Sequence, residues 1–259
     1  MSAPSHSYGS LPLALLAGGL ATRLGDLTAH VPKSLLTVAG EPFISHQLRL
    51  LAFEGVRDII ICCGHLGEQI EEFIGDGSRF GCHVRYSSDG PSLLGTGGAI
   101  RRALPLLGSR FWVMYGDSYL LAPFAPILAA FHTSHQPALL TVFANQNRWD
   151  TSNVEFADGR IIRYDKRNPQ PGMQHIDYGL SIYSADIFRR WPAQSAFDLS
   201  AVQRQLVDRG TIAGYEVADR FYEIGSQAGL EETDAFLAAH RNGPPCPVTH
   251  SAQISGLPA

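Results

Sequence analysis

The sequence predicts an α/β fold of the Rossmann-like, doubly wound type, in which helices cover both faces of a mixed sheet to give three layers, α/β/α. Three observations lead to this prediction. Apolar runs of strand length alternate with helical patterns from Leu13 to Tyr86, which is the order expected for a parallel sheet. Several of these runs are continuously apolar, as strands buried on both faces are. The 259 residues, 45% of them hydrophobic, are enough for one sizeable α/β domain.

The first half of the chain supplies the alternation. Leu13–Ala17 has the pattern of a buried strand. Phe43–Phe53 has apolar residues at helical spacing that end before Gly55. The remaining predicted elements of this half are, in chain order, the strand Val56–Cys63, the helix Glu68–Ile74, the strand His83–Tyr86, the helix Leu94–Leu106 and the strand Phe111–Tyr115.

The pattern changes in the second half. Asp158-Gly159 is the strongest short hairpin signal in the chain and predicts that Asn153–Phe156 and Ile161–Tyr164 pair. We therefore expect antiparallel strands to join the sheet here. The other predicted elements are the helix Pro123–His132, the strands Ala138–Phe143 and Ile176–Tyr183, a helix ending at Trp191, the helix Leu199–Val207, the strand Thr211–Glu216 and a helix from Ala228 to His240.

The first predicted strand ends in a glycine-rich loop. Gly18 and Gly19 allow a positive φ and let backbone N–H groups approach an anion, and Arg23 and Lys33 bring two positive charges to the same place. A polyphosphate would satisfy these groups. Because the stretch is neither a Walker loop nor a dinucleotide fingerprint, by itself it is also consistent with a turn that carries two solvated cations.

The loop carries a family resemblance. Leu16 to Leu24 reads Leu-Ala-Gly-Gly-Leu-Ala-Thr-Arg-Leu, and Thr28 and Pro32-Lys33-Ser34-Leu35 follow. This motif resembles the signature of the sugar-1-phosphate nucleotidyltransferases, which join a nucleoside triphosphate to a sugar 1-phosphate and release pyrophosphate. Two departures stand out: Ala21 is where the family usually has Gly, and Asp26 is where it usually has Pro.

The resemblance covers about residues 10 to 240 and implies the nucleotide-diphospho-sugar transferase fold in a single domain. The nucleotide-binding part would be about 10–122 and the sugar-binding part about 138–226, and residues 241–259 are predicted to be a disordered tail. The resemblance also implies catalytic roles for Arg23 and Lys33. The nucleotide-binding residues that it implies are Ala17, Gly18, Gly19, Thr22, Gly95, Thr96 and Gly97.

Two acidic residues are candidate ligands of Mg²⁺, the expected cofactor. Asp117 directly follows a buried strand and Gly116, and a carboxylate placed there is well suited to hold Mg²⁺ against phosphate oxygens. A helix N-cap is the alternative role for this residue. The resemblance implies Glu223 as a second ligand, although most relatives have an Asp at this place, in Asp-x-Gly-Thr.

The region after the predicted hairpin is the candidate sugar site. The resemblance implies that an acidic-Lys pair, here Asp165-Lys166, contacts the sugar hydroxyls and the sugar phosphate. It also implies that the Gly-containing strand that follows lines the sugar pocket. The full set of predicted sugar-phosphate-binding residues is Asn153, Asp165, Lys166, Asp177 and Gly179. A solvated lysine is the alternative for Lys166.

Composition excludes several other classes. The net charge of −4, with no basic block, argues against a general nucleic-acid surface. The first ten residues contain no Lys or Arg, and the apolar run after them is too short for a signal or membrane helix. The four cysteines show no disulfide framework and no CxxC spacing. A cytoplasmic protein without membrane contact is therefore expected, and the oligomeric state, a homo-oligomer included, is left open.

The sequence thus predicts an enzyme that makes a nucleotide sugar from a nucleoside triphosphate and a sugar 1-phosphate. The Tyr-Glu-Ile-Gly segment and the Asp-Tyr-Gly strand are similar to those of D-glycero-D-manno-heptose-1-phosphate guanylyltransferases, which makes GTP and that heptose phosphate the first expectation. Alternatives are a mannose- or glucose-1-phosphate nucleotidyltransferase, a phosphocholine-type cytidylyltransferase, and a non-catalytic, nucleotide-sensing regulatory subunit. A quaternary cation would call for an aromatic cage, and Asn153, Asp165 and Asp177 favour a sugar.

Overall fold

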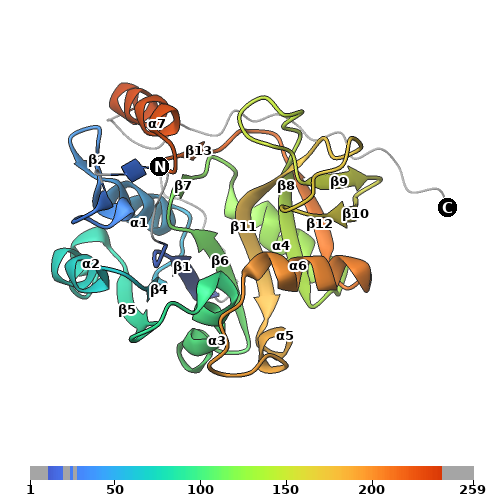
Figure 1. Ribbon diagram of the computed structural model, residues 1–259, viewed down its shortest axis with the longest axis horizontal. Helices are drawn as coiled ribbons and strands as arrows, with labels where there is room; N and C mark the ends of the chain where they lie inside the picture. Colours follow the sequence, from blue (N-terminus) through green and yellow to red (C-terminus); the bar gives the residue numbers. More distant parts are fainter. Residues whose placement is uncertain (1–10, 20–23, 26–27, 241–259) are drawn as a thin grey trace, which may run out of the picture.

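The computed structural model describes residues 11–19, 24–25 and 28–240. Within these residues the main sheet has seven strands (Figure 1). From one edge to the other they are β12 (Ala213–Val217), β8 (Ala138–Phe143), β11 (Ile176–Ser184), β6 (Arg110–Tyr115), β1 (Leu13–Leu16), β4 (Asp58–Cys63) and β5 (His83–Ser88).

The sheet is mixed, as predicted. β1 pairs in parallel with β4 on one side and β6 on the other, β4 pairs in parallel with β5, and β8 with β12. β11 runs antiparallel to both of its neighbours, β6 and β8. After β1 the chain forms β4 and β5 on one side of it and then β6 on the other. At such a reversal of the strand order a crevice is expected beyond the carboxyl ends of the two strands concerned, here β1 and β6.

Helices cover both faces of the sheet, and alternate residues of β1 show the division. Leu13 and Leu15 belong to one apolar cluster, and Ala14 belongs to the other. The helices that contribute to the first cluster are α1 (Phe43–Phe53), α2 (Gly67–Ile74), α4 (Phe124–Ser134) and α7 (Gln227–Ala239). Those that contribute to the second are α3 (Gly95–Leu107), α5 (Ala185–Arg189) and α6 (Leu199–Asp208).

Three short ladders stand beside the main sheet in the part of the chain that the structure describes. The predicted hairpin is present as β9 (Val154–Ala157) and β10 (Arg160–Tyr164). It forms a sheet of its own, so the expectation that antiparallel strands join the main sheet is met by β11 and not by the hairpin. The other two ladders pair β2 (Thr37–Val38) with β3 (Glu41–Pro42), and β7 (Ser118–Tyr119) with β13 (Tyr222–Glu223).

The predicted helices and strands are present, with ends that differ by no more than two residues. Short 3₁₀ turns at Lys33–Leu35 and Ser78–Phe80 add to them. The predicted tail, 241–259, lies outside the described residues. Among the residues that are described, none of the helices combines the length and the apolar character needed to span a bilayer.

Candidate active site

A cavity of about 320 Å³ lies at the carboxyl ends of β1 and β6. We call it the β1 cavity. Its lining residues are Leu16, Ala17, Gly18, Gly19, Lys33, Ser34, Cys62, Asp89, Leu93, Gly95, Thr96, Ala99, Tyr115, Gly116, Asp117 and Asp198. The predicted nucleotide-binding residues Ala17, Gly18, Gly19, Gly95 and Thr96 therefore line one cavity, although three of them precede the other two by some 80 positions. Thr22 and Arg23 lie outside the described residues.

Glycines bring the loops of this cavity close together. A Cβ on Gly18 would lie 2.9 Å from the backbone N of Gly64, and one on Gly116 would lie 2.6 Å from the carbonyl oxygen of Leu16. The expected positive φ is found at neither Gly18 nor Gly19. Close approach of the backbone is therefore the reason for Gly18, whereas Gly19 faces open space, where a Cβ would meet nothing within 4 Å.

A second cavity, of about 770 Å³, lies beside the first. We call it the β11 cavity, and its lining residues are Lys33, Tyr115, Asp117, Ser118, Asp150, Thr151, Asn153, Lys166, Pro169, Ile176, Asp177, Tyr178, Gly179, Phe221, Glu223 and Gly225. Lys33, Tyr115 and Asp117 line both cavities. The predicted catalytic lysine and the predicted metal ligand thus stand on a shared wall.

Three charged groups meet at Gly225. The Lys33 Nζ lies 2.6 Å from Asp117 Oδ2. A Cβ on Gly225 would lie 2.7 Å from Glu223 Oε2, 3.6 Å from Asp117 Oδ2 and 3.7 Å from Lys33 Nζ. The ladder between β7 and β13 causes this arrangement, because it sets Glu223 opposite Ser118, the residue after Asp117.

The donor set at this point suits Mg²⁺. Mg²⁺ in phosphate-transfer sites is held by one or two carboxylates together with waters and substrate phosphates. Asp117 and Glu223 supply two carboxylates, and the described residues contain no larger cluster of metal-binding side chains. Glu223 also has a structural role, since its carboxylate accepts hydrogen bonds from the backbone N–H of Gly225 and from Ser226 Oγ at the start of α7. Each carboxylate oxygen keeps a second lone pair for a cation.

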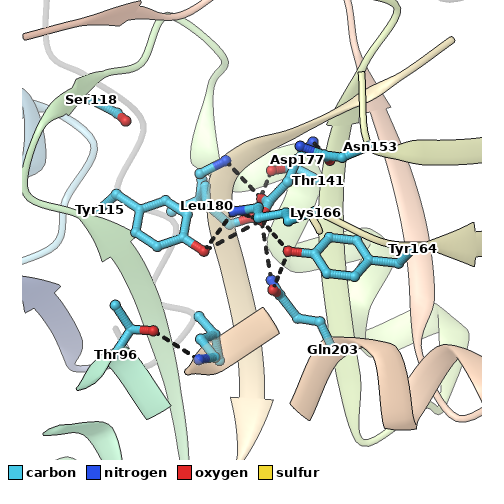
Figure 2. A network of polar contacts seen from close by, with 12 residues as sticks. Thr96, Tyr115, Ser118, Thr141, Asn153, Tyr164, Lys166, Asp177, Leu180 and Gln203 are labelled. Atoms are coloured by element: carbon cyan, nitrogen blue, oxygen red, sulfur yellow. Dashed lines mark hydrogen bonds and ion pairs between the residues drawn. The ribbon is translucent and has the colours of Figure 1, made fainter. Parts of the chain in front are cut away.

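A buried polar network holds Lys166 (Figure 2). The Nζ of Lys166 lies 3.0 Å from Asp177 Oδ2 and donates to the Tyr115 hydroxyl at 3.1 Å. The Tyr164 hydroxyl donates to Gln203 Oε1 at 2.7 Å, and Gln203 Nε2 reaches Asp177 Oδ2 at 3.4 Å. The Asp177 side chain is 1% exposed and the Lys166 side chain 34%. Asp177 is therefore turned into this network, and Lys166 presents its ammonium at the edge of the β11 cavity.

Opposing effects act on the pKa of Lys166. Desolvation favours the neutral amine, but the Asp177 carboxylate and the phenol groups of Tyr115 and Tyr164 outweigh it and raise the pKa of Lys166 well above its ordinary value. Burial, only partly offset by the Lys166 ammonium, raises the pKa of Tyr115 to about 12. At neutral pH the β11 cavity is therefore lined by a charged Lys166 and a neutral Tyr115.

The other predicted sugar-site residues are placed differently. Asn153 and Gly179 line the β11 cavity, and Gly179, with φ +93, donates its backbone N–H to Asp177 Oδ1. Asp165 is absent from that lining within the described residues. Its Oδ1 accepts the backbone N–H groups of Arg167 and Asn168, a local turn that follows directly from the sequence Asp-Lys-Arg-Asn.

The glycines in the first turn of α3 pack against a distant segment. The backbone N–H groups of Gly97 and Gly98 donate to the Phe197 carbonyl oxygen, at 2.9 and 3.1 Å. A Cβ on Gly97 would lie 2.4 Å from the Phe197 ring. Two of the N-terminal donors of α3 are thereby satisfied within the protein, and Gly97 itself is not among the residues that line the β1 cavity.

Sequence reasoning missed two acidic residues of the β1 cavity. Asp198 follows Phe197, and its Oδ2 lies 3.6 Å from Arg167 Nη2. Asp89 is 6% exposed, its Oδ2 accepts the backbone N–H of Leu94 at 3.0 Å, and its buried Oδ1 has no hydrogen-bond partner. Burial raises the pKa of Asp89. A carboxyl directly after β5 at the same sheet edge as Asp117 was the signal that could have found it.

Comparison with known proteins gives consistent matches. The family model described as Nucleotidyl transferase matches residues 14–222. The chain is 32% identical over 231 residues to N-acetylmuramate alpha-1-phosphate uridylyltransferase of Neisseria meningitidis serogroup B, covering 87% of this chain and 97% of that protein. It is 25% identical over 211 residues to D-glycero-alpha-D-manno-heptose 1-phosphate guanylyltransferase of Campylobacter jejuni, covering 82% and 93%.

A solved structure shares the fold. HddC from Yersinia pseudotuberculosis, in complex with GMP-PN, superposes with a TM-score of 0.74 at 21% identity, covering 88% of this chain and 99% of that one.

Proposed function

The chain belongs to the nucleotidyl transferase family and is a sugar-1-phosphate nucleotidyltransferase, and we propose that its β1 cavity takes the nucleoside triphosphate and its β11 cavity the sugar 1-phosphate. The observation that carries this assignment is the wall that the two cavities share at Lys33, Tyr115 and Asp117. Two anions bound in these cavities would meet beside a lysine and a carboxylate.

The reaction needs orientation and positive charge. An oxygen of the sugar phosphate attacks the α-phosphorus of the triphosphate in line, a P–O bond forms, and the bond to the β-phosphate breaks to release pyrophosphate. Since the attacking phosphate is already an anion, no strong general base is required. Lys33 offsets the charge that develops at the α-phosphate, Lys166 holds the sugar phosphate, and Arg23 is assigned to the β- and γ-phosphates.

Asp117 and Glu223 are the residues that we assign to Mg²⁺. When bound, the ion would neutralise phosphate charge and help to orient the triphosphate. The closeness of both carboxylates to one point at Gly225 supports the assignment.

For the base, we propose guanine first. The unpartnered Oδ1 of Asp89 is a buried acceptor in the lining of the β1 cavity, and guanine offers it adjacent N–H donors. The 25% identity to the heptose 1-phosphate guanylyltransferase supports GTP with D-glycero-D-manno-heptose 1-phosphate. Mannose 1-phosphate and glucose 1-phosphate remain alternative acceptors.

The second candidate is UTP with N-acetylmuramate 1-phosphate. It is favoured by the 32% identity to the uridylyltransferase that bears that name, of which this chain covers 97%. Uracil would present a single N–H to Asp89.

The test is a matrix of four nucleoside triphosphates against these sugar 1-phosphates and phosphocholine, read by pyrophosphate release in Mg²⁺. We expect release with GTP and a sugar 1-phosphate. Release with no pair at all would contradict catalysis and favour a nucleotide-sensing subunit, and release only with CTP and phosphocholine would contradict the sugar assignment.

A further inference from the structure

We infer that the acceptor is a polyhydroxylated sugar 1-phosphate that carries no charge besides its phosphate, and that a sugar with its own carboxylate is discriminated against. This inference rests on the proposed function. It concerns the β11 cavity, whose described lining contains two ammonium groups, Lys33 and Lys166, and four carboxyl groups. The four are Asp117, Asp150, Asp177 and Glu223.

Both ammonium groups are already paired within the protein. Lys33 Nζ lies 2.6 Å from Asp117 Oδ2, and Lys166 Nζ lies 3.0 Å from Asp177 Oδ2. The sugar phosphate itself needs the positive charge of these lysines. In the part of the chain that the structure describes, no further cation lines this cavity to receive a second anionic group on the sugar.

Asp150 contributes negative charge where the sugar body would lie. Its Oδ1 accepts the backbone N–H of Thr151 at 2.6 Å, and no lysine, arginine or histidine of the described residues lies within ion-pair distance of it. Even with Asp117 and Glu223 assigned to Mg²⁺, this carboxylate has no counter-charge among the residues that the structure describes. A carboxylate accepts hydrogen bonds and donates none, so its natural partner here is a hydroxyl group, and a second carboxylate would be repelled.

Asn153 adds a hydrogen-bond donor to the same cavity. The side chain is 7% exposed, and its Oδ1 accepts the backbone N–H of Asp177 at 3.0 Å. This hydrogen bond fixes which end of the amide is oxygen. The Nδ2 group is then left without a hydrogen-bond partner among the described residues, on a residue that lines the cavity. A hydrogen-bond acceptor bound in the cavity can pair with this donor.

A sugar hydroxyl is the group that satisfies both demands. It accepts a hydrogen bond from an amide such as Asn153 Nδ2 and donates one to a carboxylate such as Asp150. Heptose, mannose and glucose 1-phosphates offer several hydroxyls and no further charge. N-acetylmuramate 1-phosphate carries a lactyl carboxylate, and the charges of the β11 cavity oppose it.

The experiment compares kcat/KM for acceptors that separate charge from size, with whichever nucleoside triphosphate supports turnover. The acceptors are D-glycero-D-manno-heptose 1-phosphate, mannose 1-phosphate, N-acetylglucosamine 1-phosphate, N-acetylmuramate 1-phosphate and the lactyl amide of the last. We expect a neutral sugar to exceed N-acetylmuramate 1-phosphate by at least about tenfold, or about 1.4 kcal/mol, and the amide to recover most of that loss.

Two variants test the assignment to Asp150. Asp150→Lys should raise the activity with N-acetylmuramate 1-phosphate relative to mannose 1-phosphate by about tenfold. Asp158→Asn, at the exposed tip of the β9–β10 hairpin, is the matched control and should leave the ratio unchanged.

Three results would overturn the inference. The first is that the parent prefers N-acetylmuramate 1-phosphate, and the second is that the lactyl amide is as poor an acceptor as the acid. The third is that Asp150→Lys has the same activity with N-acetylmuramate 1-phosphate relative to mannose 1-phosphate as the parent. Each of them leaves the proposed nucleotidyl transfer intact, whereas absence of pyrophosphate release with every acceptor would refute the proposed function itself.

Discussion

The ammonium group of Lys166 lies 3.0 Å from Oδ2 of Asp177, a carboxylate that is 1% exposed. Tyr115, Tyr164 and Gln203 surround the pair, and each places a polar side-chain atom within 3.4 Å of the same Asp177 oxygen (Figure 2). Asp177 was predicted to be one of the residues that bind the sugar phosphate substrate. The network instead assigns it to holding Lys166 charged and in position at the cavity edge, and its own contact with substrate stays a prediction.

The first prediction concerns this pair. In the parent, the raised pKa of Lys166 keeps the ammonium charged through the neutral range, and its contribution is lost only as pH rises through that pKa. Asp177→Asn removes the carboxylate charge that does most to offset the desolvation of Lys166. The pKa of Lys166 therefore falls. We expect the KM for sugar 1-phosphate to rise with pH in the variant between about pH 7 and 10, where the parent stays flat.

The same variant should lose about 2–3 kcal/mol of stability, somewhat less than a fully buried broken pair costs, because Lys166 is one-third exposed and screened. The measurements are KM against pH and chemical denaturation, with Asp158→Asn as control. Equal KM profiles in variant and parent would show that Asp177 does not act through Lys166.

The second prediction is that Asp117→Asn keeps the fold and loses most turnover. The change removes one charge from the proposed Mg²⁺ site, and we expect kcat to fall by about a hundredfold or more. The Lys33–Asp117 pair is partly exposed, so its loss should cost no more than about 1 kcal/mol of stability. Steady-state kinetics over a range of Mg²⁺ concentrations and a thermal melt check both parts. Normal turnover would leave Asp117 with a structural role alone.

The third prediction separates the two roles of Glu223. Its carboxylate accepts hydrogen bonds at the start of α7, and Ser226 Oγ also accepts from the Gly229 N–H. Glu223→Gln and Ser226→Ala should each cost about 1 kcal/mol of stability. Only Glu223→Gln should raise the Mg²⁺ concentration needed for half-maximal activity. If both variants have the Mg²⁺ dependence of the parent, Glu223 is a capping residue and no ligand.

The fourth prediction compares two glycines of the predicted nucleotide site. A Cβ on Gly97 would lie 2.4 Å from the Phe197 ring, whereas one on Gly19 meets nothing within 4 Å. Gly97→Ala should therefore lower stability by about 1–3 kcal/mol through overpacking. Gly19→Ala should keep the melting temperature and raise the KM for the triphosphate, since its methyl group would occupy the β1 cavity. If Gly97→Ala kept the parent's stability and Gly19→Ala lost stability, the packing role of Gly97 would be contradicted.

The fifth prediction concerns Asp89. Replacing its unpartnered carboxyl by an amide, in Asp89→Asn, removes an acceptor for adjacent N–H groups of the base. We expect affinity for GTP to fall by about tenfold, the equivalent of one hydrogen bond to a charged group. Affinity for ATP, which lacks guanine's paired donors, should change much less. Isothermal titration with each triphosphate measures this, and equal losses for GTP and ATP would remove Asp89 from base recognition.

Much of the fold was predictable because local patterns determine it. Continuous apolar runs identified β1, β4 and β6 as buried strands, and the rule that parallel strands present their carboxyl ends at one edge brought Gly18 and Asp117 together. Asp158-Gly159 fixed the hairpin through its turn. These signals depend on residues within a few positions of one another.

The partners of the site residues were not predictable in this way. Gly97 was expected beside the nucleotide, but Phe197, 100 positions away, occupies the space next to it. Asp165 was expected at the sugar, but its own turn takes up one of its oxygens. Tyr164 and Gln203 had no signal at all, because a tyrosine in a strand and a glutamine in a helix are ordinary.

By itself, then, the sequence determined the family, the order of the elements and the edge of the sheet at which the two cavities lie, since periodicity and loop motifs encode these directly. Only the tertiary structure decided which carboxylates of the cavities pair with lysines and which do not. Asp150 and Asp177 carry the same carboxylate group, but different side chains surround the two. Segments far apart in the chain create those surroundings. Burial and charge at a site are properties of the packed molecule, and no local stretch of residues carries them.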